Sequence, residues 1–218
     1  MRRRALACVI VCCLVGLAGC SLLRPRVRSG PSERAPAASE YFPAAVGTRW
    51  EYAGSGNEFA AFTAEATHRE GNLAQVVVMS GAAVAYVYEI LPERVTERLR
   101  RAEIDTVENF LHEKPTAPRD ILRGPLAAGL EWTNPVPDPA DPQGSPAEET
   151  RRIEAVGITV ETPAGRFERV IKVRIRGPVG PDVVEYYAPG VGLVRREFLS
   201  EEPVISELSR FVPPPSAP

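Results

Sequence analysis

The sequence is poor in the side chains that most often bind metals. Its 218 residues include four cysteines and two histidines, His68 and His112, which stand 44 positions apart. A zinc site usually needs three or four nitrogen or sulfur ligands. We therefore expect no metal site and no cofactor, and we expect both histidines to face solvent. The formal net charge of −2 also gives no reason to expect a nucleic acid as a partner.

The motifs of common hydrolases and nucleotide-binding enzymes are absent as well. The Gly-Ser-Gly at 54–56 lacks the glycines that stand two residues before and two residues after the serine of a nucleophile elbow. No glycine-rich segment matches a phosphate-binding loop. Asp138 and Asp141 stand among prolines, without the alternating acidic ligands of a calcium loop. These absences favour a protein that is not an enzyme.

A short apolar run at the amino terminus is the clearest targeting signal. Arginines at positions 2–4 precede apolar residues 5–19. That run is shorter than the roughly 20 residues that a helix needs to cross a bilayer core. A basic start followed by a short apolar run is typical of a secretory signal peptide. We therefore expect residues 1–19 to be a signal peptide.

The end of this run, Leu17-Ala18-Gly19-Cys20, resembles the lipobox of bacterial lipoproteins, in which a branched apolar residue and two small residues precede a cysteine. The resemblance implies that the Cys20 thiol receives a diacylglyceryl group and that the chain is cut between Gly19 and Cys20. It also implies a fatty acid such as palmitate on the new amino terminus. Two or more acyl chains give stable membrane attachment. The alternative is an ordinary secretory leader that ends in a cysteine by chance.

An anchor at Cys20 predicts a location in the cell envelope, outside the cytoplasm, with membrane lipid as a partner. In Gram-negative lipoproteins, an aspartate after the cysteine resembles an inner-membrane retention signal. Ser21 stands there instead, which favours the outer membrane in such a cell. Residues 20–40 are rich in proline, serine and alanine without apolar periodicity, so we expect the lipidated cysteine to be followed by a flexible tether. Residues 213–218 are predicted to be a disordered tail.

Residues 41–212 are predicted to form a single β-rich domain. Apolar and charged residues alternate along 167–176, which is the period of a strand with one buried face. Similar segments, separated by glycine and proline turns, recur in both halves. We expect a mainly β fold, a single curved antiparallel sheet in a half-barrel-like meander with at most one or two short helices. Residues 103–113 are compatible with a short helix or with an irregular crossing segment.

Two tryptophans follow the same local pattern. Trp50 and Trp132 each stand three residues after a glycine, Gly47 or Gly129. Glycine can adopt a positive φ at the start of a strand, and the tryptophan can then close the end of the sheet. The two interpretations are an aromatic clamp on a ligand and a plug in the core, and the pattern favours the plug.

The body is also similar to many uncharacterised bacterial envelope lipoproteins. The similarity lies in the opening YFPAAVGTRWEY at 41–52, in TPAGRF at 162–167 and in YAPGVGLV at 187–194. These motifs are turns and strand starts, so the resemblance implies a fold and brings no activity with it. The implied architecture is a strongly curved antiparallel sheet around one helix or loop, as in periplasmic lipoprotein carriers.

Two functional hypotheses follow from these observations. The first is a membrane-anchored, non-enzymatic binding or scaffolding module, with an apolar ligand in the concave face of the sheet or an envelope protein at its edge. The second is a carboxylate-dependent envelope hydrolase that uses Glu89, Glu185 and Glu197, because these glutamates interrupt apolar strands. A hollow concave face would favour carriage, and a filled one would favour a scaffold.

Replacement of Cys20 by serine tests the predicted anchor. Serine has no thiol to form the thioether, so we expect Cys20→Ser to remain unlipidated and to lose normal processing. Intact-mass measurement of the product and its sedimentation with membranes check both points, with Ser21→Ala as the matched control. Normal cleavage and sedimentation of Cys20→Ser with bilayers would contradict the prediction.

Overall fold

The computed structural model describes residues 36–105, 108–138, 141 and 144–215. The predicted signal peptide, its cleavage site at Gly19 and Cys20, and most of the predicted tether lie outside these residues. The described elements are the 3₁₀ turn η1 (Ala38–Tyr41) and the strands β1 (Arg49–Ser55), β2 (Phe62–Glu70), β3 (Leu73–Ser80), β4 (Ala82–Leu91), β5 (Arg94–Ala102), β6 (Arg119–Arg123), β7 (Glu131–Val136), β8 (Ala147–Thr162), β9 (Gly165–Arg176), β10 (Val183–Ala188), β11 (Gly192–Phe198) and β12 (Val204–Val212).

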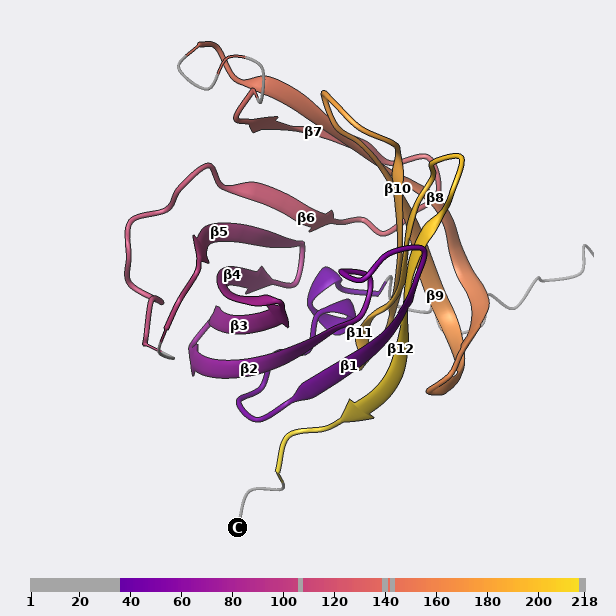
Figure 1. The fold of residues 1–218 in the computed structure, drawn as a ribbon, viewed down its shortest axis with the longest axis horizontal. Helices are drawn as coiled ribbons and strands as arrows, with labels where there is room; N and C mark the ends of the chain where they lie inside the picture. Colours follow the sequence, from indigo (N-terminus) through magenta and orange to yellow (C-terminus); the bar gives the residue numbers. More distant parts are fainter. Residues whose placement is uncertain (1–35, 106–107, 139–140, 142–143, 216–218) are drawn as a thin grey trace, which may run out of the picture. The chain divides into compact units, whose positions relative to one another are not determined.

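All twelve strands belong to one antiparallel sheet, which confirms the predicted fold class. Strands β1 to β6 form one meander and β7 to β12 form a second. Pairing of β1 with β12 joins the two halves, so that β6 and β7 are the two edges of the sheet. Figure 1 shows that the sheet curls strongly and brings the β6 edge to the same side as β7. No helix among the described residues is long and apolar enough to span a membrane.

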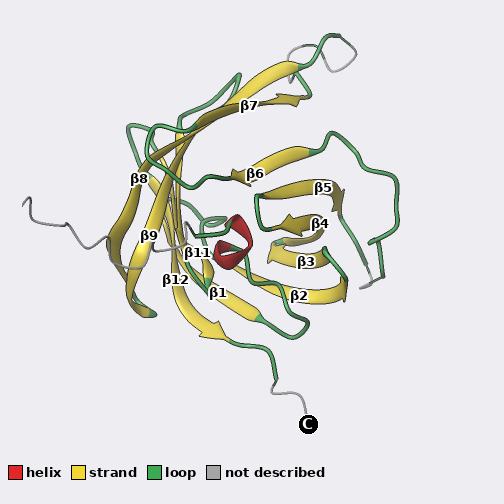
Figure 2. Ribbon diagram, turned by 180° about the vertical axis from the view of Figure 1, so that it is seen from behind, coloured by secondary structure: helices red, strands yellow, loops and turns green. Residues whose placement is uncertain are grey.

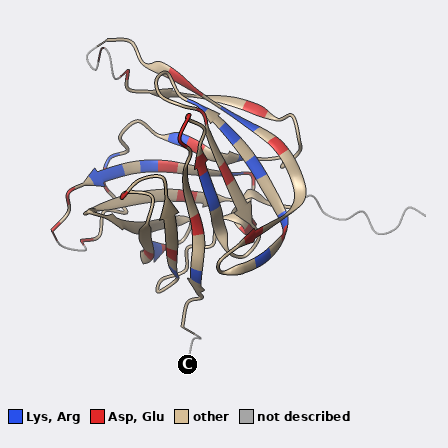
Figure 3. Ribbon diagram, turned by 45° about the vertical axis from the view of Figure 1, so that its right-hand side comes forward, with Lys and Arg blue, Asp and Glu red and all other residues tan. Residues whose placement is uncertain are grey.

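Charged side chains cover the outer face of the second half. Along β9 the residues at 172, 174 and 176 point outward, as their alternation with apolar neighbours predicts. Lys172 forms an ion pair with Glu154 at 2.9 Å, and Arg174 forms ion pairs with Glu154 and with Asp182. Figure 3 shows the resulting blue and red bands on these strands. The opposite, concave face is therefore the one that encloses the interior.

The segment between β5 and β6 is irregular rather than helical in its described part. The buried side chain of Gln75 takes the place of helical hydrogen bonds there. Its Nε2 donates to the carbonyl of Glu108 at 2.8 Å, and its Oε1 accepts from the backbone N–H of Phe110 at 2.8 Å. Phe110 and Leu111 are thereby held against the outer face of the sheet, in a small cluster with Val87. The described part of 103–113 is therefore the irregular crossing segment, and not the short helix, of the two predicted alternatives.

The residues around η1 close one end of the curved sheet. The backbone N–H of Ala38 donates to the carbonyl of Pro92 at 2.7 Å, and the backbone carbonyl of Glu40 accepts from the N–H of Gly190 at 2.7 Å. The hydroxyl of Tyr41 donates to the carbonyl of Arg169 at 2.9 Å. Figure 2 shows η1 inside the curve of the sheet. The first residues of η1 fall in the segment expected to be a tether, and Ala38 is fully buried.

The two halves begin in the same way. Gly47 and Gly129 both have positive φ values, 86° and 92°. Gly47 donates its N–H to the carbonyl of Ala66 on β2 at 2.8 Å. Gly129 donates its N–H to the carbonyl of Ile153 on β8, also at 2.8 Å. A residue with a Cβ is strained at such φ values, so the glycines fix the chain reversal that places each tryptophan three residues later.

The β6–β7 boundary, which we call the seam, is closed by side chains. No backbone hydrogen bond joins the two strands in the described part of the chain. Instead, the side-chain amide of Asn134 bonds both backbone groups of Asp120. Its oxygen accepts from the Asp120 N–H at 2.9 Å, and its nitrogen donates to the Asp120 carbonyl at 3.1 Å. The indole N–H of Trp132 donates to the same carbonyl at 2.9 Å. Asn134 and Trp132 on β7 thus satisfy backbone groups of β6 that a neighbouring strand would otherwise pair.

Candidate functional site

The concave face of the sheet encloses a cavity of about 790 Å³. This volume lies within the range of roughly 300–1,000 Å³ that is usual for small-molecule sites. Phe42 and Pro43, which follow η1, line the closed end. At the other end the lining comes from the loops between strands, at Asn57, Pro181 and Ser200. The concave face is therefore hollow rather than filled by its own side chains.

The loops around the open end, which we call the mouth, contact one another. The hydroxyl of Ser80 donates to the carbonyl of Phe59 at 3.2 Å, which joins the β3–β4 turn to the β1–β2 loop. The N–H of Leu199 donates to the carbonyl of Asp182 at 2.8 Å, which joins the β11–β12 and β9–β10 loops. Most of the large apolar side chains that remain exposed in the described residues lie on these loops or beside them: Phe59, Met79, Val179 and Leu199.

One wall of the cavity is apolar and aromatic. Tyr52 stacks on Phe62 with ring centroids 4.2 Å apart, and Phe42 packs against Tyr88 at 4.6 Å. Val76 and further apolar residues of β1 to β4 continue this wall. The hydroxyl of Tyr52 is satisfied by the carbonyl of Leu193 at 2.8 Å. Its polar atom therefore faces the protein, while its ring contributes apolar surface to the cavity.

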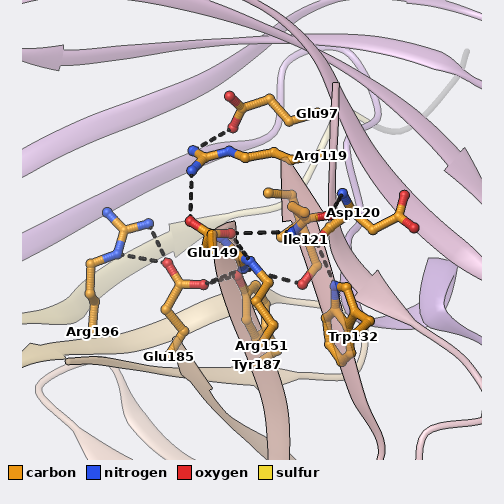
Figure 4. A network of polar contacts seen from close by, with 11 residues as sticks. Glu97, Arg119, Asp120, Ile121, Trp132, Glu149, Arg151, Glu185, Tyr187 and Arg196 are labelled. Atoms are coloured by element: carbon orange, nitrogen blue, oxygen red, sulfur yellow. Dashed lines mark hydrogen bonds and ion pairs between the residues drawn. The ribbon is translucent and has the colours of Figure 1, made fainter. Parts of the chain in front are cut away.

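The other wall carries six alternating charges, which we call the charge chain: Glu97, Arg119, Glu149, Arg151, Glu185 and Arg196. Arg119 joins β5 to β8, with ion pairs to Glu97 at 3.0 Å and to Glu149 at 3.1 Å. Arg151 joins Glu149 at 2.7 Å and Glu185 at 3.4 Å. Arg196 completes the chain at Glu185, at 2.8 Å. Figure 4 shows this continuous line of contacts.

The charge chain also crosses the seam. Arg119 lies on β6, whereas Glu149 and Arg151 lie on β8, beyond β7. Besides its ion pairs, Arg151 donates through Nη1 to the carbonyl of Ile121 on β6 at 3.3 Å. Charged side chains therefore reinforce the closure that Trp132 and Asn134 make directly. The same residues form the polar wall and hold the sheet closed.

Bulges place two arginines on the concave face. In β5 one extra residue lies between the pairs Val87–Leu99 and Tyr88–Glu97, so Arg100 faces inward together with Glu97. In β11 an equivalent shift brings Arg196 to the inner face, opposite Glu185. A bulge reverses the face that later residues of its strand present. Strict alternation would have placed both arginines outside.

Burial makes full pairing necessary for the charge chain, since an unpaired buried charge is strongly destabilising. Burial by itself raises the pKa of Glu185, but attraction to Arg196 and Arg151 and a hydrogen bond from Tyr187 outweigh it and lower that pKa to about 2. Burial by itself lowers the pKa of Arg119, and attraction to Glu97 and Glu149 raises it above its usual value. Glu185 is therefore an ionised structural carboxylate rather than a proton donor at neutral pH.

Tyr187 is held protonated beside Glu185. Burial raises the pKa of Tyr187 well above its usual value, and the charge of Glu185 raises it further. Its hydroxyl donates to Glu185 Oε2 at 2.5 Å. The hydroxyl thereby supplies one more charge-assisted hydrogen bond to a carboxylate that is nearly inaccessible to water.

The three glutamates proposed for a hydrolase are not brought together. Glu185 lines the cavity, but Glu89 and Glu197 are not among the lining residues. Glu89 forms an ion pair with Arg94 at 3.8 Å, and Glu197 forms one with Arg195 at 2.5 Å. The carboxylates that do share the cavity are Glu97, Glu149 and Glu185, and each of them is engaged by arginine.

The two tryptophans have different surroundings although both are buried. Trp50 lines the cavity and donates its indole N–H to the carbonyl of Val191 at 2.7 Å. Trp132 does not line the cavity and serves the seam. His112 is largely exposed, with its Nε2 in hydrogen-bond contact with Glu70 Oε2 at 2.9 Å, whereas His68 is half-buried and hydrogen-bonds to Gln75. No group of three or more metal-ligating side chains occurs among the described residues.

Comparison with known proteins finds two distantly similar structures. No protein-family model and no curated protein matches the chain. A "putative lipoprotein" from Parabacteroides distasonis is 18% identical with a TM-score of 0.46, over 82% of this chain and 99% of that chain. A "putative exported protein" with a YmcC-like fold, from Bacteroides fragilis, is 15% identical with a TM-score of 0.40, over 82% and 100%. These distant similarities assign neither a ligand nor an activity.

Glu185→Gln tests the ionised state of the charge chain. The pKa of Glu185 in the folded protein, about 2, lies below its ordinary value of 4.5, so the carboxylate stabilises the fold above about pH 5 and loses this contribution as the pH falls toward 2. We expect the variant to lose on the order of 3 kcal/mol of unfolding free energy at pH 7. The loss should shrink steadily as the pH is lowered.

Urea denaturation at a series of pH values measures this loss directly. Glu197→Gln is the matched control, because it removes a carboxylate from the same pair of strands outside the cavity lining. The control is expected to change the unfolding free energy by less than about 1 kcal/mol. A loss in Glu185→Gln that stays constant from pH 7 to pH 3 would contradict the assignment.

Proposed function

We propose that this protein is a lipid-anchored, extracytoplasmic binding protein that takes up an amphipathic small molecule in the cavity of its curved sheet. The cavity of about 790 Å³ carries the proposal, because it has an apolar wall and a charged wall facing the same space. A purely apolar ligand would match the apolar wall alone, because the other wall presents charged side chains to the same space. A ligand with both an apolar and a polar part matches both walls.

Hydrocarbon contact with the apolar wall supplies the binding energy in this proposal. Each methylene group removed from water contributes about 0.8 kcal/mol. The aromatic rings of Tyr52, Phe62 and Tyr88 are held by packing against neighbouring rings, so little side-chain entropy is lost when a ligand binds. The apolar side chains at the mouth, such as Phe59 and Leu199, offer a path along which such a ligand enters.

A binding role is better supported than hydrolysis or scaffolding. Hydrolysis by the hypothesis above needs carboxylates that converge, and Glu89 and Glu197 lie outside the cavity lining. A scaffold that pairs with a partner through a sheet edge needs a free edge, whereas β6 and β7 are joined to each other at the seam. Attachment through Cys20, at the outer membrane if the cell is Gram-negative, would keep the cavity near a source of amphipathic molecules.

Filling the cavity with one side chain tests the proposal. We expect Val78→Trp to weaken binding of the fluorescent probe N-phenyl-1-naphthylamine at least tenfold, because Val78 lines the cavity and an indole would occupy the ligand's space. Met79→Trp is the matched control, since Met79 is the next residue of β3 and its side chain is about half exposed. The control is expected to bind like the unmodified chain.

The measurement uses residues 20–218 with Cys20→Ser, produced without the leader. This chain retains the whole described sheet and needs no detergent, which would compete for the cavity. We expect the unmodified chain and Met79→Trp to bind one probe per chain, and Val78→Trp to lose this binding. No binding by the unmodified chain, or equal binding by Val78→Trp, would overturn the proposed function.

A further inference from the structure

One charged residue of the cavity stands outside the charge chain. Arg100 lines the cavity beside Tyr86, with its guanidinium carbon 5.8 Å from the centre of the Tyr86 ring. In the described part of the chain no carboxylate forms an ion pair with it. Its sequence neighbour Arg101 does have such a partner, Glu113. Arg100 is therefore a cation that is positioned by an aromatic ring and left without an anion.

The charges that line the cavity do not cancel. Glu97, Glu149 and Glu185 are balanced by the three arginines of the charge chain, and Arg100 is left over. This excess positive charge stands at the rim of the cavity, because Arg100 lines the cavity and is itself exposed to solvent. It attracts an anion, repels a cation, and gains little from an uncharged polar group.

Arg100 is placed where the head of an amphipathic ligand would lie. It stands near the end of β5, and the chain that follows passes the β3–β4 turn, where Ile104 donates its N–H to the carbonyl of Ala83 at 3.2 Å. This turn belongs to the mouth. From Arg100 the rings of Tyr86 and Tyr88, with centroids 6.1 Å apart, lead toward Phe42 at the closed end.

We infer that the ligand of the cavity is an amphiphile with an anionic head group, a carboxylate or a phosphate, which Arg100 binds at the mouth while the hydrocarbon part lies along the apolar wall. A guanidinium presents parallel N–H donors that match the oxygens of either head group. Contact with the Tyr86 ring limits the orientations of the side chain. The inference rests on the proposed function and specifies the chemistry of the ligand.

A series of ligands with the same ten-carbon chain tests the head group. Decanoate and decyl phosphate are expected to bind the Cys20→Ser chain at least tenfold more tightly than decanol and decyltrimethylammonium, in isothermal titration below the micelle concentration. Affinity for the two anions should fall as salt is added. Inorganic phosphate alone should show no measurable binding, because it lacks the hydrocarbon part.

Variants of Arg100 assign the preference to this residue. Arg100→Gln is expected to weaken decanoate binding about tenfold and to leave decanol binding unchanged, and Arg100→Lys to retain part of the preference for the anions. Arg101→Gln is the matched control, because it removes a neighbouring arginine that does not line the cavity. Its affinities should equal those of the unmodified chain.

Each contrary result has a distinct meaning. Equal affinity for anionic and cationic heads, or an Arg100→Gln variant that keeps the preference, would overturn the inference while the proposed function stands. Binding of inorganic phosphate as tight as that of decyl phosphate would overturn the amphipathic ligand. If no ten-carbon ligand and no N-phenyl-1-naphthylamine binds, the proposed function itself is wrong.

Discussion

The join between β6 and β7 is the interaction on which the cavity depends. A sheet edge normally leaves backbone donors and acceptors unpaired, and here Asn134 and Trp132 satisfy those of Asp120. Arg119 and Glu149 reinforce the join with an ion pair at 3.1 Å. Because these charges are largely buried, the loss of one partner is expected to destabilise the fold by about 3–5 kcal/mol. The charged wall of the cavity and the closure of the sheet are therefore one feature.

The two halves of the chain explain why the cavity has two unlike walls. Gly47 and Gly129 start equivalent strands, β1 and β7, 82 positions apart. Strand β1 continues into a backbone ladder with β12, which leaves Tyr52 free to stack on Phe62 in the apolar wall. At the equivalent place in β7 stands Asn134, which is occupied in satisfying the backbone of β6. One repeated design thus gives an aromatic wall on one side and a polar seam on the other.

Local pattern predicted the strands but not the site. Alternation along 167–176 identified a strand with one buried face, and the turn residues identified a meander. The inward positions of Arg100 and Arg196 depend on bulges in β5 and β11, which arise from pairing with neighbouring strands and leave no mark in the period of a single strand. The charge chain joins residues of five strands, so its members other than Glu185, which interrupts an apolar strand, look like ordinary surface charges until the sheet closes. Lipidation of Cys20 stays a prediction, because it lies outside the described residues.

The most direct measurement of the central claim is a double-mutant cycle across the seam, with Arg119→Met and Glu149→Gln, read as the free energy of unfolding of the non-lipidated chain. If side-chain pairing closes the sheet, the two substitutions are not independent, and the double variant should lose about 1–3 kcal/mol less than the two single variants lose together. Losses that add to within about 0.5 kcal/mol would contradict the account, because the two residues would then stabilise the fold separately and the seam would not be what holds the cavity closed.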